Sequence, residues 1–198
     1  MRQMIGYGLV GLLCLVPATT LAQADRSQAT GRIEYRVQAT TRTSTMAKEM
    51  NEAADAGFRY DAVMGGETAI GGKEVVTVMS RVEGVKEHYQ YQLLATNRTS
   101  TMQRELQDAA ERGFEYRGQT VFESLMGGRE VVCILERNVD RRPAGNYVYK
   151  LLATTKTSTM ERELQQSGAD GFEVVGLTIG KTALGGSELV TIMRRKVR

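Results

Sequence analysis

The sequence predicts an α+β protein built from three tandem β-α-β-β repeats. Three short motifs recur in a constant order: Thr-Ser-Thr-Met from Thr43, Thr99 and Thr157, then Gly-Phe from Gly57, Gly113 and Gly171, then Gly-Gly from Gly71, Gly127 and Gly185. Both spacings between these motifs are fourteen residues in every copy. Such constancy indicates that one supersecondary unit was triplicated, and it places the repeats at residues 31–82, 87–138 and 145–198.

Each repeat opens with alternating residues that predict a half-buried strand. The alternating positions are Ile33, Tyr35, Val37 and Ala39 in the first copy, Tyr89, Tyr91, Leu93 and Ala95 in the second, and Tyr147, Tyr149, Leu151 and Ala153 in the third. A period of two with aromatic and β-branched residues is the pattern of a strand that buries one face.

A helix is expected directly after each first strand. Ser44, Ser100 and Ser158 are suitable N-caps, and in the second and third copies Gln103 and Glu161 complete capping boxes. Apolar residues then recur on one helical face, at Met46, Met50, Ala53 and Ala54 and at Met102, Leu106, Ala109 and Ala110. The glycines of the Gly-Phe motifs are expected to end the helices in the left-handed conformation.

Two further strands complete each repeat, separated by a turn at the Gly-Gly motif. The most apolar segments are the third strands, around residues 75–79, 131–135 and 189–193. A right-handed β-α-β crossover leaves space for one strand between its arms, so the third strand is expected in the middle and antiparallel to both neighbours. The predicted sheet is therefore antiparallel or mixed, of order 1-3-2, with one helix on one face.

The three repeats are expected to pack into one pseudo-symmetric body. A unit of about 50 residues buries too little surface to be stable alone, and order 1-3-2 leaves its first and second strands as open edges. Packing edge to edge and packing around a pseudo-threefold axis both remain open from the sequence. The connecting segments from Val82 to His88 and from Asn138 to Asn146 differ in length and read as linkers.

Residues 1–24 have the pattern of a secretory signal peptide. Arg2 precedes an apolar run from Met4 to Leu21, and Ala22-Gln23-Ala24 offers the small residues that signal peptidase requires. We expect cleavage after Ala24 and a periplasmic or secreted location. The alternative is an uncleaved anchor, which Pro17 disfavours because a spanning helix needs about 20 uninterrupted apolar residues.

Composition limits the classes of function. Without the leader, 25 basic residues face 23 acidic ones, because one of the 26 basic residues is Arg2. This balance disfavours nucleic-acid binding, which requires a concentrated basic face. Only Cys133 would remain of the two cysteines, so no intramolecular disulfide is expected.

The third copy resembles a known family. Its segments Glu-Leu-Gln-Gln-Ser-Gly-Ala-Asp-Gly-Phe-Glu-Val-Val from Glu163 and Ser-Glu-Leu-Val-Thr-Ile-Met-Arg-Arg from Ser187 are similar to the short β-α-β-β proteins of domain-of-unknown-function family 4177. Those proteins close their helix with a Gly-x-x-Gly-aromatic-Glu-apolar-Val signature and end their last strand in basic residues. The resemblance implies the fold and brings no established activity.

The turns between first strand and helix are the candidate binding sites. Each gathers a basic residue, hydroxyl groups and free amides at a helix N-terminus, which attracts anions. The candidate anion ligands are Arg42, Thr43, Ser44, Arg98, Thr99, Ser100, Lys156, Thr157 and Ser158. The alternative is that the serines only cap the helices, a threonine satisfies the turn, and the basic side chains are solvated.

No catalytic or metal site is predicted, and no cofactor. His88 is the single histidine and lies in a linker, which disfavours Ser-His-Asp and Cys-His chemistry. Met46, Met102 and Met160 recur once per repeat and suit core packing better than copper binding. Two sets of acidic residues recur with the scaffold, at Glu49, Glu105 and Glu163 and at Glu74, Glu130 and Glu188. An enzyme would use a cleft between copies, with Glu130 as base and Arg98 as oxyanion clamp.

The sequence thus favours an exported, non-catalytic binding or assembly module of the cell envelope. Its partner would be an envelope protein or a small anionic ligand. The alternatives are an enzyme or small-anion-binding protein with a site between repeats, and a purely structural envelope component.

Overall fold

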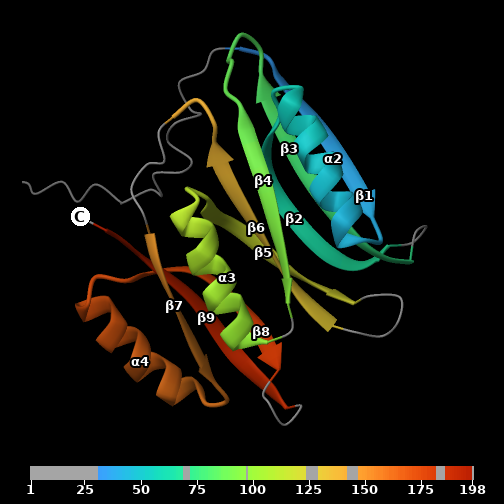
Figure 1. The fold of residues 1–198 in the computed structure, drawn as a ribbon. Coiled ribbons are helices and arrows are strands. Elements are labelled where there is room, and N and C mark those ends of the chain that lie inside the picture. Colours follow the sequence, from blue (N-terminus) through green and yellow to red (C-terminus); the bar gives the residue numbers. More distant parts are fainter. Residues whose placement is uncertain are drawn as a thin grey trace, which may run out of the picture. The chain divides into compact units, whose positions relative to one another are not determined.

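The computed structural model describes residues 31–68, 72–96, 98–123, 129–141, 147–181 and 186–197. Residues Arg32–Arg198 form one compact unit (Figure 1). Its elements follow in the order β1 (Ile33–Thr40), α2 (Thr43–Asp55), β2 (Arg59–Thr68), β3 (Gly72–Val82), β4 (Tyr89–Thr96), α3 (Thr99–Glu111), β5 (Glu115–Glu123), β6 (Arg129–Asn138), β7 (Tyr147–Thr154), α4 (Thr157–Ala169), β8 (Glu173–Lys181) and β9 (Ser187–Lys196). The predicted α+β class with three β-α-β-β repeats is confirmed.

Each repeat forms its own antiparallel sheet with the third strand in the middle. The orders are β1-β3-β2, β4-β6-β5 and β7-β9-β8, named here sheet 1, sheet 2 and sheet 3. The predicted order 1-3-2 is therefore confirmed. The second strand of every sheet carries an irregularity at the same place, directly after Tyr60, Tyr116 and Val174. Such bulges bend an edge strand and re-aim its side chains.

The helices bury the faces that their sequences predict. The residues buried on α2 are Met46, Met50, Ala53 and Ala54, and those buried on α3 are Met102, Leu106, Ala109 and Ala110. Each helix ends at the glycine of its Gly-Phe motif. Gly57, Gly113 and Gly171 have φ angles of 83°, 83° and 81°, the left-handed region in which a Cβ is unfavourable.

An arginine near the end of each third strand closes the C-terminus of its helix. The guanidinium groups of Arg81, Arg137 and Arg195 donate to the carbonyl oxygens of Ala56, Arg112 and Asp170 at 3.1, 3.1 and 2.9 Å. They also lie over the rings of Phe58, Phe114 and Phe172, at 4.9, 4.9 and 4.8 Å from the centroids. Cations are favourable both at helix C-termini and over aromatic rings, so this contact explains why the phenylalanine and the arginine recur together.

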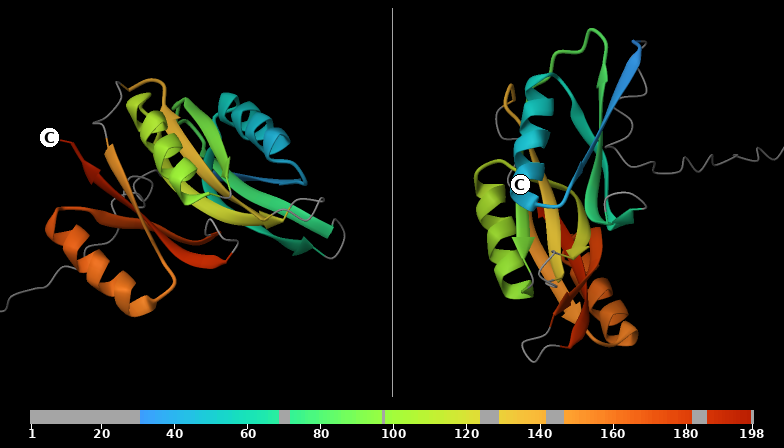
Figure 2. Two further views of the ribbon diagram at one scale, coloured as in Figure 1. Left: turned by 60° about the horizontal axis from the view of Figure 1, so that its bottom comes forward. Right: turned by 90° about the vertical axis from the view of Figure 1, so that its right-hand side faces the viewer.

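The repeats stack so that the helix of one repeat packs against the sheet of the next, and the three sheets remain separate. We call the side of a sheet covered by its own helix the front face and the other side the back face. Helix α2 lies between the front face of sheet 1, at Val75 and Met79, and the back face of sheet 2, at Val132 and Ile134. Helix α3 lies in the same way between sheet 2 and sheet 3. The views in Figure 2 show the three helices following one another along the stack, with α4 last.

Some sequence predictions fall outside the described residues. They concern the leader at residues 1–24 and the glycines Gly71, Gly127 and Gly185. The next residue after the first of these, Gly72, has a φ of 73°, which suits the expected turn. Within the described ranges, every helix is too short or too polar to cross a bilayer.

Candidate functional site

The strand-to-helix turns are organised by the last threonine of each first strand. The hydroxyl groups of Thr40, Thr96 and Thr154 accept the backbone N–H groups of Arg42, Arg98 and Lys156 at 3.3, 3.2 and 3.2 Å. These bonds fix a tight turn two residues ahead of the helix. The repeated Ala-Thr dipeptide before the turn is therefore part of the motif, and its threonine satisfies the turn, as the alternative interpretation of the sequence expected.

The expected serine N-caps are not present. Each helix begins at the threonine of the Thr-Ser-Thr-Met motif, and the N-cap position is held by Arg42, Arg98 and Lys156 in extended conformation without a side-chain cap. Ser44, Ser100 and Ser158 are therefore one position inside the first turn. A side chain there cannot accept the N–H groups that an N-cap serves, so the two predicted capping boxes are also wrong.

The basic residues of the three turns are exposed. Within the described ranges, the side chains of Arg42, Arg98 and Lys156 make no hydrogen bond or ion pair, so Arg98 and Glu130 are not paired. The turns thus lie at three separate places, each with its own basic residue, threonine and serine. Nothing within the described residues joins one turn to another.

One turn is already in contact with a carboxylate of the chain. Thr99, the first residue of α3, donates its hydroxyl hydrogen to Glu188 of the third repeat at 2.6 Å. A carboxylate is favourable at this end of a helix because of the free amides and the helix dipole. In repeat 2 the third repeat thus supplies a carboxylate to the threonine hydroxyl group of the turn.

A tyrosine on the back face joins each sheet to the preceding repeat. The hydroxyl group of Tyr91 in sheet 2 accepts the backbone N–H of Tyr60 at 2.7 Å. The hydroxyl group of Tyr149 in sheet 3 accepts the backbone N–H of Tyr116 at 2.8 Å. Because β2 and β5 are edge strands, these outward N–H groups need a partner, and a tyrosine of the next repeat supplies it.

An amide side chain on α2 and another on α3 make hydrogen bonds to the backbone of the first strand of the next sheet, which is its other edge strand. Asn51 on α2 accepts the backbone N–H of Tyr91 at 2.9 Å and donates to its carbonyl oxygen at 3.0 Å. Gln107, at the same position on α3, accepts the backbone N–H of Tyr149 at 3.1 Å. Strands β4 and β7 are thereby closed against further pairing by a helix of the preceding repeat.

A glycine on the bulged strand receives the tyrosine of the preceding repeat. A Cβ added at Gly118 would collide with the hydroxyl group of Tyr60, and a Cβ at Gly176 would collide with that of Tyr116. In the first repeat, the same position is Ala62. The tyrosine and the glycine therefore form a complementary pair at each internal interface.

A buried carboxylate holds repeat 1 to repeat 2. Glu136 on β6 accepts Nε and Nη2 of Arg59 at 3.1 and 2.9 Å and the hydroxyl group of Tyr91 at 2.9 Å, and Arg117 lies 3.5 Å away. Burial alone would lower the pKa of Arg59, but its hydrogen bonds to Glu136 raise it overall. Burial, followed by the charge of Glu136, raises the pKa of Tyr91, so the tyrosine stays a donor.

The second interface uses the opposite placement of charges. Glu115 holds the position of Arg59, and Arg194 holds the position of Glu136. Burial raises the pKa of Glu115, while the neighbouring charge of Arg194 acts to lower it. Arg194 also donates to Glu173 of its own sheet at 2.7 Å. The two internal interfaces therefore differ in the sign of the charge that each repeat offers.

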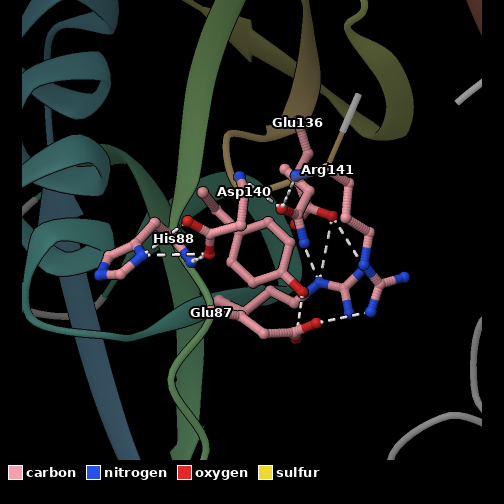
Figure 3. Close-up of polar contacts among 8 residues, drawn as sticks. Glu87, His88, Glu136, Asp140 and Arg141 are labelled. Atoms are coloured by element: carbon pink, nitrogen blue, oxygen red, sulfur yellow. Dashed lines mark hydrogen bonds and ion pairs between the residues drawn. The ribbon is translucent and has the colours of Figure 1, made fainter. Parts of the chain in front are cut away.

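The two linkers contact each other. The backbone N–H of His88 donates to Asp140 at 2.9 Å, the His88 ring lies 3.0 Å from the same carboxylate, and Arg141 pairs with Glu87 at 2.9 Å (Figure 3). The hydrogen bonds from the backbone and the ring of His88 lower the pKa of Asp140. His88 is exposed, as expected, and it ties the first linker to the second.

At the two ends of the stack, positions are exposed whose equivalents in the inner repeats are covered. On sheet 1, Ile33, Tyr35 and Val37 are 49%, 67% and 64% exposed, against 4% and 3% for Tyr91 and Tyr149. The apolar positions of β1 were expected to face a core, and here they face outward. At the other end, α4 buries only Met160 and Ser167, and Val174, Leu177 and Ile179 of β8 are exposed.

Within the described residues, no group of three or more histidine, cysteine, aspartate or glutamate side chains is placed to hold a metal ion. The chain was also compared with known proteins. No family model, curated protein or solved structure matches it.

Proposed function

We propose that this chain is an exported, non-catalytic assembly module of the cell envelope that docks a protein partner on its end faces. The observation that carries the proposal is the apolar back face of sheet 1. Ile33, Tyr35 and Val37 are exposed there, although the equivalent positions in sheets 2 and 3 are covered by a helix. The end unit of a repeat protein usually carries a polar outer face, so an apolar one indicates a contact surface.

The chemistry of the internal interfaces suggests what the partner brings. A helix with an amide side chain covers the back face of sheets 2 and 3, and it supplies a hydrogen bond to the tyrosine backbone at the sheet edge. A partner for sheet 1 would therefore present an amphipathic helix with a polar amide near its centre. This docking needs no catalytic residue.

The proposal is tested by photo-crosslinking in cells that express the full chain. A benzophenone amino acid is placed at Val37, on the sheet 1 face, and in a separate variant at Val85, an exposed apolar position in the turn after β3. We expect an adduct to protein from position 37 and none from position 85. Equal labelling from both positions, or none from position 37, contradicts the proposal. Mass spectrometry of the adduct identifies the partner.

A further inference from the structure

The stack has a regular alternation of sheet and helix that stops at both ends. The back faces of sheets 2 and 3 are fully buried by the preceding helix, at Val132, Ile134, Val190 and Ile192, all 0% exposed. At the same positions of sheet 1, Val76 and Val78 are only half-buried. Sheet 1 thus has the face that receives a helix, and no helix of the described residues covers it.

Helix α4 has the complementary surface. Its Leu164 and Gln165 hold the positions that Leu106 and Gln107 hold on α3. On α3 the leucine is buried in the core shared with sheet 3 and the glutamine accepts the Tyr149 N–H. On α4 the leucine is half-buried and the glutamine exposed. The last helix therefore retains residues that serve an interface in the preceding repeat.

We propose that the third repeat of one copy docks on the back face of sheet 1 of a second copy, in the arrangement that joins adjacent repeats within the chain. This inference rests on the proposed function and names the partner as the chain itself. Gln165 then accepts the backbone N–H of Tyr35 in the second copy. The Tyr35 hydroxyl group accepts the backbone N–H of Val174, and Leu164 packs on Val76 and Val78.

Two coupled sequence differences fit this contact. At both internal interfaces a tyrosine packs against a glycine, as Tyr60 does on Gly118. At the ends of the chain the two positions are Val174 and Ala62. In the proposed contact Val174, which is smaller than tyrosine, meets Ala62, which is larger than glycine. The summed volume of the two side chains is therefore partly kept. Interfaces tolerate such volume-conserving changes well.

The charges oppose wrong pairings between copies. Docking repeat 1 on sheet 3 would bring Arg59 to Arg194, and docking repeat 2 on another sheet 2 would bring Glu115 to Glu136. Like charges in a buried interface are strongly unfavourable. The contact of repeat 3 with sheet 1 brings Glu173, paired to Arg194 in its own sheet, to the neutral Ser80. Both wrong pairings would also need a sheet whose back face is already covered within its own chain, whereas no helix of the described residues covers the back face of sheet 1.

Such a contact joins two different surfaces, so it is heterologous. A heterologous contact forms a closed ring if its rotation closes and an open filament if it does not. Adjacent repeats of the described chain are joined by equivalent contacts, Tyr91 to Tyr60 and Tyr149 to Tyr116, so a contact of the same kind between copies continues the stack of alternating sheets and helices.

The test is sedimentation equilibrium of protein purified from cells that express the full chain, from micromolar to near-millimolar concentration. One variant blocks the sheet 1 face with Tyr35→Lys and Val37→Lys. A second blocks the other face with Gln165→Lys and Val174→Lys. All four side chains are exposed, so each variant is expected to keep the wild-type circular dichroism spectrum and melting temperature. Val85→Lys is the control for an exposed apolar residue outside both faces.

We expect the wild type and Val85→Lys to associate with rising concentration. Each blocked variant alone should associate at least about tenfold more weakly, as is typical when a tyrosine at the centre of an interface is lost. An equimolar mixture of the two blocked variants should form dimers and nothing longer, because one open face of each kind remains. Wild type that stays monomeric, a blocked variant that associates as strongly as the wild type, or a control that fails to associate overturns the inference.

The result also separates this inference from the proposed function. If the wild type stays monomeric while the probe at Val37 forms an adduct with a different protein, docking on sheet 1 holds and self-association is wrong. If the probe at Val37 forms no adduct with any protein, both are wrong. An adduct between the probe and residues near Val174 of a second copy supports both.

Discussion

The Tyr149 hydroxyl group accepts the backbone N–H of Tyr116 at 2.8 Å, and this bond crosses from the third repeat to the second. Tyr91 makes the same contact with Tyr60 one repeat earlier. Tyr35 holds the same position in the first repeat and is 67% exposed. One side-chain type in one local sequence pattern therefore has two environments, because a helix of the preceding repeat covers Tyr91 and Tyr149 and no helix of the described residues covers Tyr35.

The first prediction compares these three tyrosines. Tyr91→Phe and Tyr149→Phe each remove the acceptor of a buried N–H, which should lower the free energy of unfolding by about 1–3 kcal/mol. Tyr35→Phe is the matched control and should change the free energy by less than about 0.5 kcal/mol. Urea unfolding at low micromolar concentration measures all three. An equal loss in Tyr35→Phe contradicts the assignment of the interfaces.

The second prediction concerns the buried charge at the first interface. Glu136→Gln leaves Arg59 without its ion pair in a buried place and should cost about 3–5 kcal/mol of stability. The double variant Arg59→Glu with Glu136→Arg reproduces the placement of charges found at Glu115 and Arg194. It should be more stable than the sum of its single variants predicts. A double-mutant cycle in urea measures this coupling, and strict additivity contradicts it.

The third prediction concerns the glycines that receive the tyrosines. Gly118→Ala places a methyl group against the hydroxyl group of Tyr60 and forces the buried ring to move, at a cost of about 1–3 kcal/mol. Ala62 holds the same position in the first repeat and is exposed. Ala62→Gly should therefore lower the stability measured by thermal unfolding by well under half as much as Gly118→Ala does. A comparable loss at both positions excludes the tyrosine contact as the cause.

The fourth prediction is an alkaline limit to stability. Burial raises the pKa of Tyr60 and of Tyr149 from 10.0 to about 12. In the unfolded chain these groups ionise near pH 10, while the folded protein keeps their protons. Their contribution to stability is therefore complete below pH 10 and is lost as the pH rises through 12. Urea unfolding at a series of pH values should show this fall, and Tyr149→Phe should reduce its slope. A free energy of unfolding that stays constant as the pH rises from 10 to 12 would contradict the burial of these tyrosines.

The fifth prediction concerns the thiol of Cys133. Burial raises its pKa to about 12, so almost no thiolate is present at neutral pH. We expect no modification by iodoacetamide in the native protein and full modification in urea, located at Cys133 by peptide mapping. Rapid native labelling at this cysteine would mean that the core of sheet 2 is open.

The recurrence of the sequence motifs predicted most of the fold. Regular spacing identified the strands, the helix faces at Met46 and Met102, and the glycine stops, because these depend on residues close in sequence. The N-cap prediction failed for a local reason. Thr40 already fixes the turn, and the helix starts one residue before Ser44.

The contacts between repeats could not be predicted in the same way. Asn51 and Gln107 look like ordinary exposed polar residues of a helix, and only the neighbouring sheet gives them a role. The amide at this position recurs as Gln165, and the tyrosine of the first strand recurs three times. The recurrence of the amide and the tyrosine indicated a contact shared by the repeats. Which of these amides and tyrosines are buried depends on the order in which the repeats stack. The candidate anion ligands likewise recur, and of these only Thr99 was found against a carboxylate.

The most direct test of the account is amide hydrogen exchange, measured by NMR at Tyr35, Tyr91 and Tyr149 over a range of protein concentrations. The Tyr91 and Tyr149 amides donate to Asn51 and Gln107, so they should exchange slowly at every concentration. The Tyr35 amide should exchange quickly in dilute protein and slow down as copies associate. Equal rates at all three positions, or a Tyr35 rate that does not change with concentration, would contradict a stack that is closed within the chain and continued between chains.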